Sequence, residues 1–213
     1  LLGMTRAVQD FVKYGRRDME RPGRDSKSGM LPPKVSQMML NIGSTSRQKV
    51  ILDPFCGSGT ILQEAMLLGF KGIHGSDLSP KAVQDSKNNV KWLKKEFDLD
   101  TEANIQQSDI QNLNKNFAPN SIDLIVTEPF MGDARIIRNK RNIQDLIDIK
   151  EELQYLYLKA FTQFKQILKP KGKIVFIFPI FNIRDENLST LDKNLIKQID
   201  FSMVPPKIKS DQL

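Results

Sequence analysis

Residues 49–60, KVILDPFCGSGT, decide the fold, and the other segments are interpreted by their distance from them. Val50–Leu52 is a short apolar run that ends at Asp53-Pro54, as expected for a buried strand. Gly57 and Gly59 then precede a segment with apolar residues at helical spacing. Because glycine has no Cβ, such a strand, turn and helix bring the backbone close to a ligand, and the helix start offers unpaired N–H groups to it.

Several classes of ligand bind at such a corner, and the residue spacing separates them. A P-loop for ATP or GTP requires a lysine in GxxxxGK[ST], and no lysine follows Gly59. A dinucleotide fingerprint requires GxGxxG, and Leu62 occupies its third glycine position. What remains is an acid directly before the turn, Asp53, which can bind the amino acid end of S-adenosylmethionine. A turn that binds no ligand is the alternative interpretation.

DPFCGSGT resembles motif I of the Rossmann-like, class I S-adenosylmethionine-dependent methyltransferases, in the form carried by RNA guanine-N2 and DNA amino-methyltransferases. The preceding segment, RPGRDSKSGMLPPKVSQMML (residues 21–40), is similar to the one before motif I in THUMP-associated tRNA guanine-N2 methyltransferases. In that family this loop touches the methionine end of the cofactor. The resemblance implies a first set of cofactor-binding residues: Met30, Leu31, Asp53, Pro54, Phe55, Cys56, Gly57 and Gly59.

The composition limits the fold and the partners. A length of 213 residues suits one α/β domain with a small extension, and no apolar run is long enough to span a membrane. The one cysteine cannot form an internal disulfide and no targeting signal is evident, so we expect a cytoplasmic protein. The 32 Lys plus Arg exceed the 25 Asp plus Glu, and the net charge of +7 favours a polyanionic partner.

Residues 1–33 are predicted to be an irregular basic segment that precedes a methyltransferase domain over residues 34–213. Arginines around Pro22-Gly23 indicate either a loop that holds phosphates or a solvated surface arm. A helix is then expected from Lys34 to Gly43. Its predicted buried face consists of apolar residues: Val35, Met38, Met39 and Ile42.

Two acidic residues end the next two predicted strands. Lys71–Asp77 is the first of these, and Asp77 lies 18 residues after Gly59, where a carboxylate can accept both hydroxyls of a ribose. The second, Asn104–Ile110, is weaker and contains Asp109 near its end. By resemblance to the family, Asp109 binds the adenine amino group, whereas a turn cap is the alternative. These positions complete the predicted cofactor-binding set: Asp77, Leu78, Asp109 and Ile110.

Ser121–Phe130 is predicted to be a buried strand that ends at the same sheet edge as the glycine turn. Its last residues resemble motif IV, which is usually Asp, Asn or Ser, then Pro-Pro, then an aromatic residue. The motif suits methylation of an exocyclic amine, because a side-chain oxygen and a backbone carbonyl accept the two N–H groups while an aromatic ring stacks on the extruded base. The resemblance assigns Glu128 as the acceptor and Pro129 as the first proline, with Phe130 and Met131 in the second-proline and aromatic positions.

These four residues are the predicted catalytic residues, and we assign no metal ligand. Beyond them, basic residues are expected to bind the phosphates that flank a flipped nucleotide. Asp145–Leu168 is predicted as a long helix and Lys173–Pro179 as a fifth strand, with a helix over Leu188–Ile199 and a short strand over Asp200–Val204. The predicted phosphate-binding residues are Arg135, Arg138, Lys140 and Arg141.

The alternation of strands and helices predicts an α/β fold, with a doubly wound, mostly parallel sheet of about six strands. Such domains usually end in an antiparallel strand pair, and we expect that pair to be incomplete here. The resemblance implies methylation of guanine N2 in tRNA, with S-adenosylmethionine as cofactor. An N6-adenine or N4-cytosine DNA methyltransferase and a catalytically silent nucleic-acid-binding module are the alternatives. No THUMP domain is visible, so we expect a piece of a longer protein with a further RNA-binding domain outside this chain.

Overall fold

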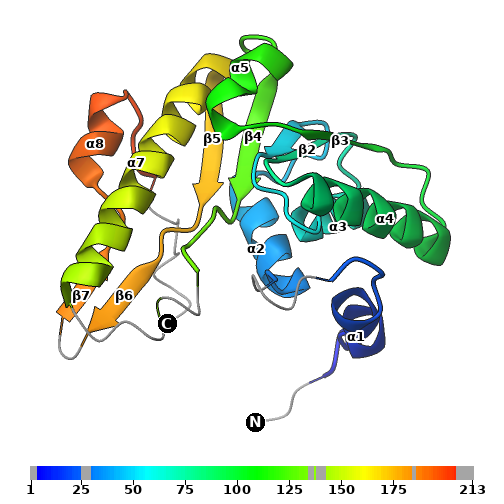
Figure 1. Ribbon diagram of the computed structural model, residues 1–213. Coiled ribbons are helices and arrows are strands. Elements are labelled where there is room, and N and C mark those ends of the chain that lie inside the picture. The colour runs from blue at the N-terminus through cyan, green and yellow to red at the C-terminus, as the bar shows by residue number, and fades with distance from the viewer. Residues whose placement is uncertain (1–3, 25–29, 134–136, 138–142, 184–185, 205–213) are drawn as a thin grey trace.

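Five parallel strands form the central sheet, in the order β3-β2-β1-β4-β5 (Figure 1). The computed structural model describes residues 4–24, 30–133, 137, 143–183 and 186–204. The chain leaves β1 towards β2 and β3 and returns on the other side of β1 with β4, so the strand order reverses between β1 and β4. Ligands of open α/β sheets bind at such a switch point. The strands are β1 (Val50–Asp53), β2 (Gly72–Asp77), β3 (Ala103–Gln107), β4 (Ile122–Thr127) and β5 (Leu168–Phe176).

Helices cover both faces of this sheet (Figure 1). One face packs against α2, α3 and α4, and the other against α5, the short 3-10 helix η1 and α7. The α1 helix packs beside α2, and α8 beside α7. The helices are α1 (Phe11–Met19), α2 (Pro33–Gly43), α3 (Thr60–Leu67), α4 (Pro80–Phe97), η1 (Ile110–Asn112), α5 (Leu113–Asn116), α7 (Ile143–Ile167) and α8 (Lys193–Gln198).

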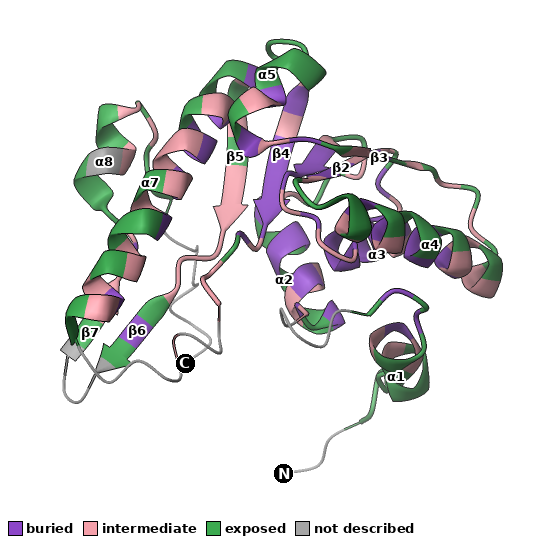
Figure 2. Ribbon diagram, viewed as in Figure 1, coloured by how far each residue is buried: buried purple, intermediate pink, exposed green. Residues whose placement is uncertain are grey.

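The two cores follow from the two-residue period of the strands. Ile51 and Leu124 face α2, α3 and α4, whereas their neighbours Leu52 and Ile125 face α5 and α7. A strand buried on both faces is apolar at successive positions, which is the pattern seen in β1 and β4. Figure 2 shows β4 almost entirely buried and α7 buried only on its inner side. The predicted doubly wound α/β fold is therefore confirmed.

The C-terminal part differs from the prediction. The main sheet has five strands, and β6 (Ile180–Ile183) pairs with β7 (Glu186–Ser189) in a separate antiparallel sheet. The predicted helix over Leu188–Ile199 was too long, because its first residues belong to β7, and Phe201–Val204 has no regular structure. Periodicity cannot assign such short apolar runs, and here packing on α7 decides their structure. Among the described residues, no antiparallel pair joins the main sheet.

The N-terminal segment is not irregular throughout, because it contains α1. The Asp10 side chain caps this helix by accepting a hydrogen bond from the Lys13 N–H at 3.0 Å. Arg17 of α1 is buried and forms an ion pair with Glu64 of α3, with 2.6 Å between Nε and Oε1. Arg21 is also buried. The expectation of a phosphate-binding loop or solvated arm was thus wrong for these two arginines, while the division at residue 33 stays a prediction.

The buried face of α2 is also shifted from the predicted one. Met38 and Ile42 are 61% and 66% exposed, so they do not belong to the core. The cause is the close approach of Gly43 to β4: a Cβ built on Gly43 would lie 2.7 Å from Leu124 Cδ1. The side that bears this glycine therefore faces the sheet. The buried residues of α2 are Pro33, Ser36, Met39, Leu40 and Gly43. None of the helices in the described part of the chain has both the length and the hydropathy of a membrane span.

Candidate functional site

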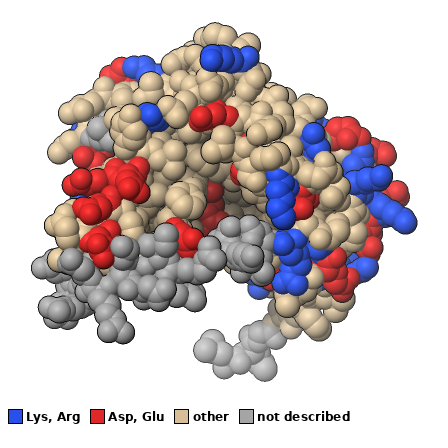
Figure 3. All heavy atoms as spheres, in the orientation of Figure 1, with Lys and Arg blue, Asp and Glu red and all other residues tan. Residues whose placement is uncertain are grey.

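An open pocket lies at the carboxyl ends of β1 and β4. It brings together seven of the residues predicted from the sequence, and three further lining residues belong to the turn and the start of α3. Figure 3 shows a hollow near the middle of this face, with acidic atoms in its depth and basic side chains on the side of α3 and α4. The predicted residues in the lining are Met30, Leu31, Asp53, Phe55, Cys56, Gly57 and Glu128, and the additional ones are Ser58, Thr60 and Ile61.

Asp53 is the buried acid of the pocket, at the end of β1. Its Oδ1 accepts hydrogen bonds from Thr127 Oγ1 at 2.6 Å and from the Phe55 N–H at 3.2 Å. Burial raises the pKa of Asp53 to about 7, and the nearby charges of Asp77 and Glu128 act in the same direction. Both of these hydrogen bonds end on Oδ1, and no described residue donates a hydrogen bond to Oδ2. Oδ2 can therefore accept a hydrogen bond from a cationic group in the pocket.

The glycine turn has the conformation that its sequence predicts. Gly57 and Gly59 have φ values of +50° and +83°, which favour glycine. A Cβ on Gly59 would lie 2.3 Å from Ser86 Oγ of α4, whereas one on Gly57 would meet no protein atom within 4 Å. The open side of Gly57 lines the pocket, and its N–H donates to Asp77 Oδ2 at 2.9 Å. The turn is therefore tied to the end of β2 while one side of its backbone stays open to a ligand.

Asp77, the last residue of β2, and Asp109, which follows β3, lie outside the pocket lining. Asp77 contacts the lining through Gly57, and its Oδ1 accepts from the Ser79 N–H at 2.9 Å. Asp109 caps the 3-10 helix η1 by accepting from the Gln111 N–H at 2.9 Å. Of their neighbours, Leu78 is 66% exposed and Ile110 belongs to the core under α7. The predicted site residues that do not line the pocket are Pro54, Gly59, Asp77, Leu78, Asp109, Ile110, Pro129, Phe130 and Met131.

The buried Arg21 adjoins the pocket lining, a position that its charge alone did not predict. Its Nη1 donates to Thr60 Oγ1 at 2.6 Å and its Nη2 to the Met30 sulfur at 3.0 Å, so it contacts two lining residues. Among the described residues, its buried Nε has no hydrogen-bond partner and the guanidinium forms no ion pair. Burial lowers the pKa of Arg21. A thioether is a weak acceptor, so a carboxylate would be a much better partner for this guanidinium.

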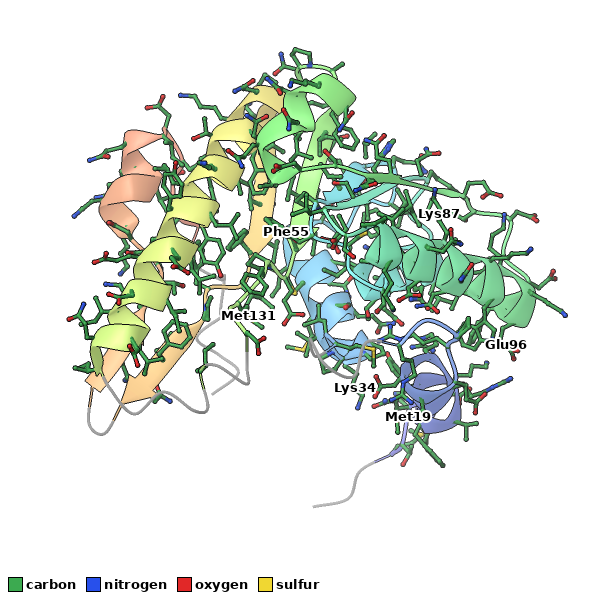
Figure 4. The ribbon with its side chains drawn as sticks, viewed as in Figure 1. Met19, Lys34, Phe55, Lys87, Glu96 and Met131 are labelled. Carbon is green, nitrogen blue, oxygen red and sulfur yellow. The ribbon has the colours of Figure 1, made fainter. Side chains whose placement is uncertain are left out.

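The segment after β4 forms the opposite side of the pocket. Glu128 is half-buried, and burial raises the pKa of its carboxyl. Phe130 is 57% exposed, and its backbone carbonyl accepts a hydrogen bond from the Tyr157 hydroxyl of α7 at 2.8 Å. Figure 4 shows Phe55 and Met131 near the ends of β4 and β5. The predicted phosphate-binding residues Arg135, Arg138, Lys140 and Arg141 lie outside the described residues.

A second hollow lies between α7 and the C-terminal segment. It is shallow and is lined mainly by aromatic and aliphatic side chains, such as Phe161, Phe178 and Ile196. None of the predicted site residues reaches it. Of these two hollows, only the pocket between β1 and β4 is lined by predicted site residues.

Comparison with protein families matches residues 21–186 to a model described as an RMKL-like methyltransferase domain. The tRNA (guanine(10)-N2)-dimethyltransferase of Pyrococcus abyssi is 26% identical over 170 residues, which are 80% of this chain and 43% of that protein. The protein with the same name from Methanothermobacter thermautotrophicus is 32% identical over 104 residues, which are 49% of this chain and 28% of that protein. The chain thus spans less than half the length of these two relatives.

Solved structures show the same fold. TrmN from Thermus thermophilus superposes with a TM-score of 0.55 at 23% identity, covering 75% of this chain and 41% of that one. A predicted N6-adenine-specific DNA methylase from Listeria monocytogenes has a TM-score of 0.53 at 16% identity, covering 76% of this chain and 46% of its own. At these identities the likeness concerns the fold alone.

Proposed function

The chain belongs to the family of RMKL-like methyltransferase domains, and we propose that it uses S-adenosylmethionine to methylate the N2 amino group of a guanine in tRNA. The observation that carries this proposal is the pocket itself, in which the motif I turn and Glu128 line one cavity at the switch point of the sheet. The names of the two relatives, both tRNA (guanine(10)-N2)-dimethyltransferases, support the choice of base and nucleic acid.

The residues around the motif I turn fit a zwitterionic amino acid with a nucleoside attached. Asp53 Oδ2 would accept from the ammonium group of S-adenosylmethionine, and Arg21 would donate to its carboxylate in place of the Met30 sulfur. Asp77 would accept the ribose hydroxyls, since each carboxylate oxygen can accept a second hydrogen bond. Asp109 stays the predicted partner of the adenine amino group. When bound, the cofactor supplies a methyl group that is already activated by its sulfonium.

The residues after β4 would hold the methyl acceptor. Glu128 and the Pro129 carbonyl would accept the two N–H groups of the exocyclic amine, whose lone pair is otherwise drawn into the ring. The exposed ring of Phe130, or the Met131 side chain, would pack on the extruded base. Because the donor is activated, alignment of the nitrogen with the methyl group contributes more than a strong general base. A cytoplasmic location and an RNA-binding domain outside this chain, both expected from the sequence, stay predictions.

The test is to incubate the full-length protein with labelled S-adenosylmethionine and either unmodified tRNA or DNA, and then to digest the product to nucleosides. We expect labelled N2-methylguanosine from tRNA. Labelled N6-methyladenine or N4-methylcytosine from DNA would overturn the choice of substrate. Tight cofactor binding without transfer to either nucleic acid would identify a silent binding module. A Glu128→Ala preparation, purified in parallel, controls for a contaminating methyltransferase.

A further inference from the structure

A hydrogen bond connects α7 to the segment that carries the predicted catalytic residues. The Tyr157 hydroxyl donates to the Phe130 carbonyl at 2.8 Å, across 27 residues of sequence. Tyr157 is only 3% exposed, whereas the Phe130 residue is 57% exposed. The Phe130 carbonyl is thus held towards the protein while its side chain stays accessible at the surface.

The tyrosine ring is itself fixed by packing. It lies edge-to-face with Phe176 of β5, with 5.0 Å between ring centroids, and with Phe178 at 5.8 Å. Leu153 of the same helix and Phe181 of β6 complete this buried cluster. Because the ring is already immobilised, little side-chain entropy is lost when its hydroxyl holds the loop. Burial also raises the pKa of Tyr157, so the hydroxyl stays a neutral donor at ordinary pH.

The hydrogen bond restricts a segment that contains one proline. A proline ring fixes its own φ at about −65°, which applies to Pro129. The next residue is Phe130, where the usual form of motif IV has a second proline. A planar peptide moves as a unit, so an anchored Phe130 carbonyl fixes the plane of the Phe130-Met131 peptide. Few torsions then remain free between this plane and the Pro129 carbonyl.

We propose that Tyr157 is a positioning residue for the methyl acceptor, and that its hydrogen bond to the Phe130 carbonyl supplies the rigidity that a second proline would otherwise provide. The inference rests on the proposed function, since it assumes that the Pro129 carbonyl and the Phe130 ring hold the target base. Tyr157 acts through these groups and does not itself touch the substrate.

The test compares Tyr157→Phe with Tyr155→Phe. The control residue lies on the same helix, is 61% exposed and packs its ring against Lys159 instead of the loop. In single-turnover assays with saturating tRNA and cofactor, we expect Tyr157→Phe to slow methyl transfer roughly 10- to 100-fold through misalignment, and Tyr155→Phe to leave the rate unchanged. Calorimetry should show unchanged affinity for S-adenosylmethionine in both variants. Amide exchange at residues 130–132 should be faster in Tyr157→Phe alone.

Two results would overturn this role. One is equal transfer rates in the two variants. The other is a parallel loss of cofactor affinity, unfolding temperature and rate in Tyr157→Phe, which would indicate a general contribution to the core. If the wild-type protein methylates neither tRNA nor DNA, the proposed function fails. The amide-exchange measurement still tests whether the Tyr157 hydrogen bond restrains residues 130–132. Equal exchange at residues 130–132 in both variants would then contradict it.

Discussion

The two sides of the pocket are held by different kinds of contact. On the motif I side, buried polar groups connect distant segments: Arg17 binds Glu64, and Arg21 binds Thr60. The fully buried Asn89 of α4 joins the N-terminal loop to the turn, because its Nδ2 donates to the Gly23 carbonyl at 2.7 Å and to the Ser58 carbonyl at 2.8 Å. On the side after β4, the segment lies beside an aromatic and aliphatic cluster, and Tyr157 of that cluster donates a hydrogen bond to it.

This difference corresponds to what each side is proposed to bind. The motif I side holds two buried groups with poor partners: Arg21, whose Nη2 donates to a thioether, and the Asp53 carboxyl, whose pKa is raised by burial. Both are costly unless a better partner is supplied. A zwitterionic ligand supplies both partners, so its binding should stabilise this side strongly. The other side needs a flat surface and a fixed carbonyl for a base, and apolar packing is sufficient to position these. Charge should therefore control cofactor affinity, and loop geometry should control transfer.

The largest expected effect is on transfer alone. Glu128→Ala removes the proposed acceptor of the amine and should slow methyl transfer by about 100-fold or more, because the reacting nitrogen is no longer held in line. Glu128→Gln keeps a carbonyl acceptor and should lose less. Single-turnover rates measure this effect, and calorimetry should show that S-adenosylmethionine binds both variants as it binds the wild type. A loss of cofactor affinity in both variants would show that the two sides are not separable.

The next largest expected effect is on the affinity for S-adenosylmethionine alone. Arg21→Gln should weaken S-adenosylmethionine binding about 10- to 100-fold, because a hydrogen bond to a charged group is worth roughly 1.5–3 kcal/mol. Decarboxylated S-adenosylmethionine lacks the group that Arg21 would bind, so its affinity should change little. Asp77→Ala is the matched comparison, since it removes the proposed ribose contact and should weaken both ligands.

Calorimetry with both ligands measures these affinities, and thermal unfolding checks that each variant is folded. If Arg21→Gln weakened the two ligands equally, the guanidinium would only support the local structure.

The smallest effect is a pH dependence set by Asp53. Its pKa of about 7 in the folded protein means that its carboxyl is increasingly protonated below that pH, and the protonated form cannot pair with an ammonium. Cofactor affinity should therefore fall with decreasing pH, approaching about tenfold per unit below about pH 7. Calorimetry between about pH 5.5 and about pH 7.5 measures this slope, and Asp53→Asn, which keeps an acceptor for Thr127, should abolish it. A pH-independent affinity in the wild type would contradict this role.

Decreasing pH should have the opposite effect on the stability of the folded protein, through the same Asp53 carboxyl. Because its pKa is higher in the folded chain than the ordinary 3.8, the folded state binds the proton more tightly. Its contribution to stability is therefore fully present below about pH 4 and is lost as the pH rises through about 7. Thermal unfolding without cofactor should show a flatter pH profile for Asp53→Asn than for the wild type.

Sequence alone predicted what depends on local spacing. The strand, glycine turn and helix around Gly57 were predicted because a four-residue strand and a positive-φ turn leave a local pattern, and the same holds for the strand that delivers Glu128. Parallel strands present their carboxyl ends at one edge, so consecutive predicted strands sufficed to bring Asp53 and Glu128 into one pocket.

Only the tertiary structure decided which side chains are withdrawn from solvent. An arginine has the same sequence signal whether it binds phosphate or pairs in the core, and the partners of Arg17 and Arg21 lie 47 and 39 residues away. The rotation of α2 depends on Gly43 meeting Leu124, and the anchor of Phe130 is a tyrosine one helix later. These contacts depend on how closely packed elements approach, which residue periodicity does not determine.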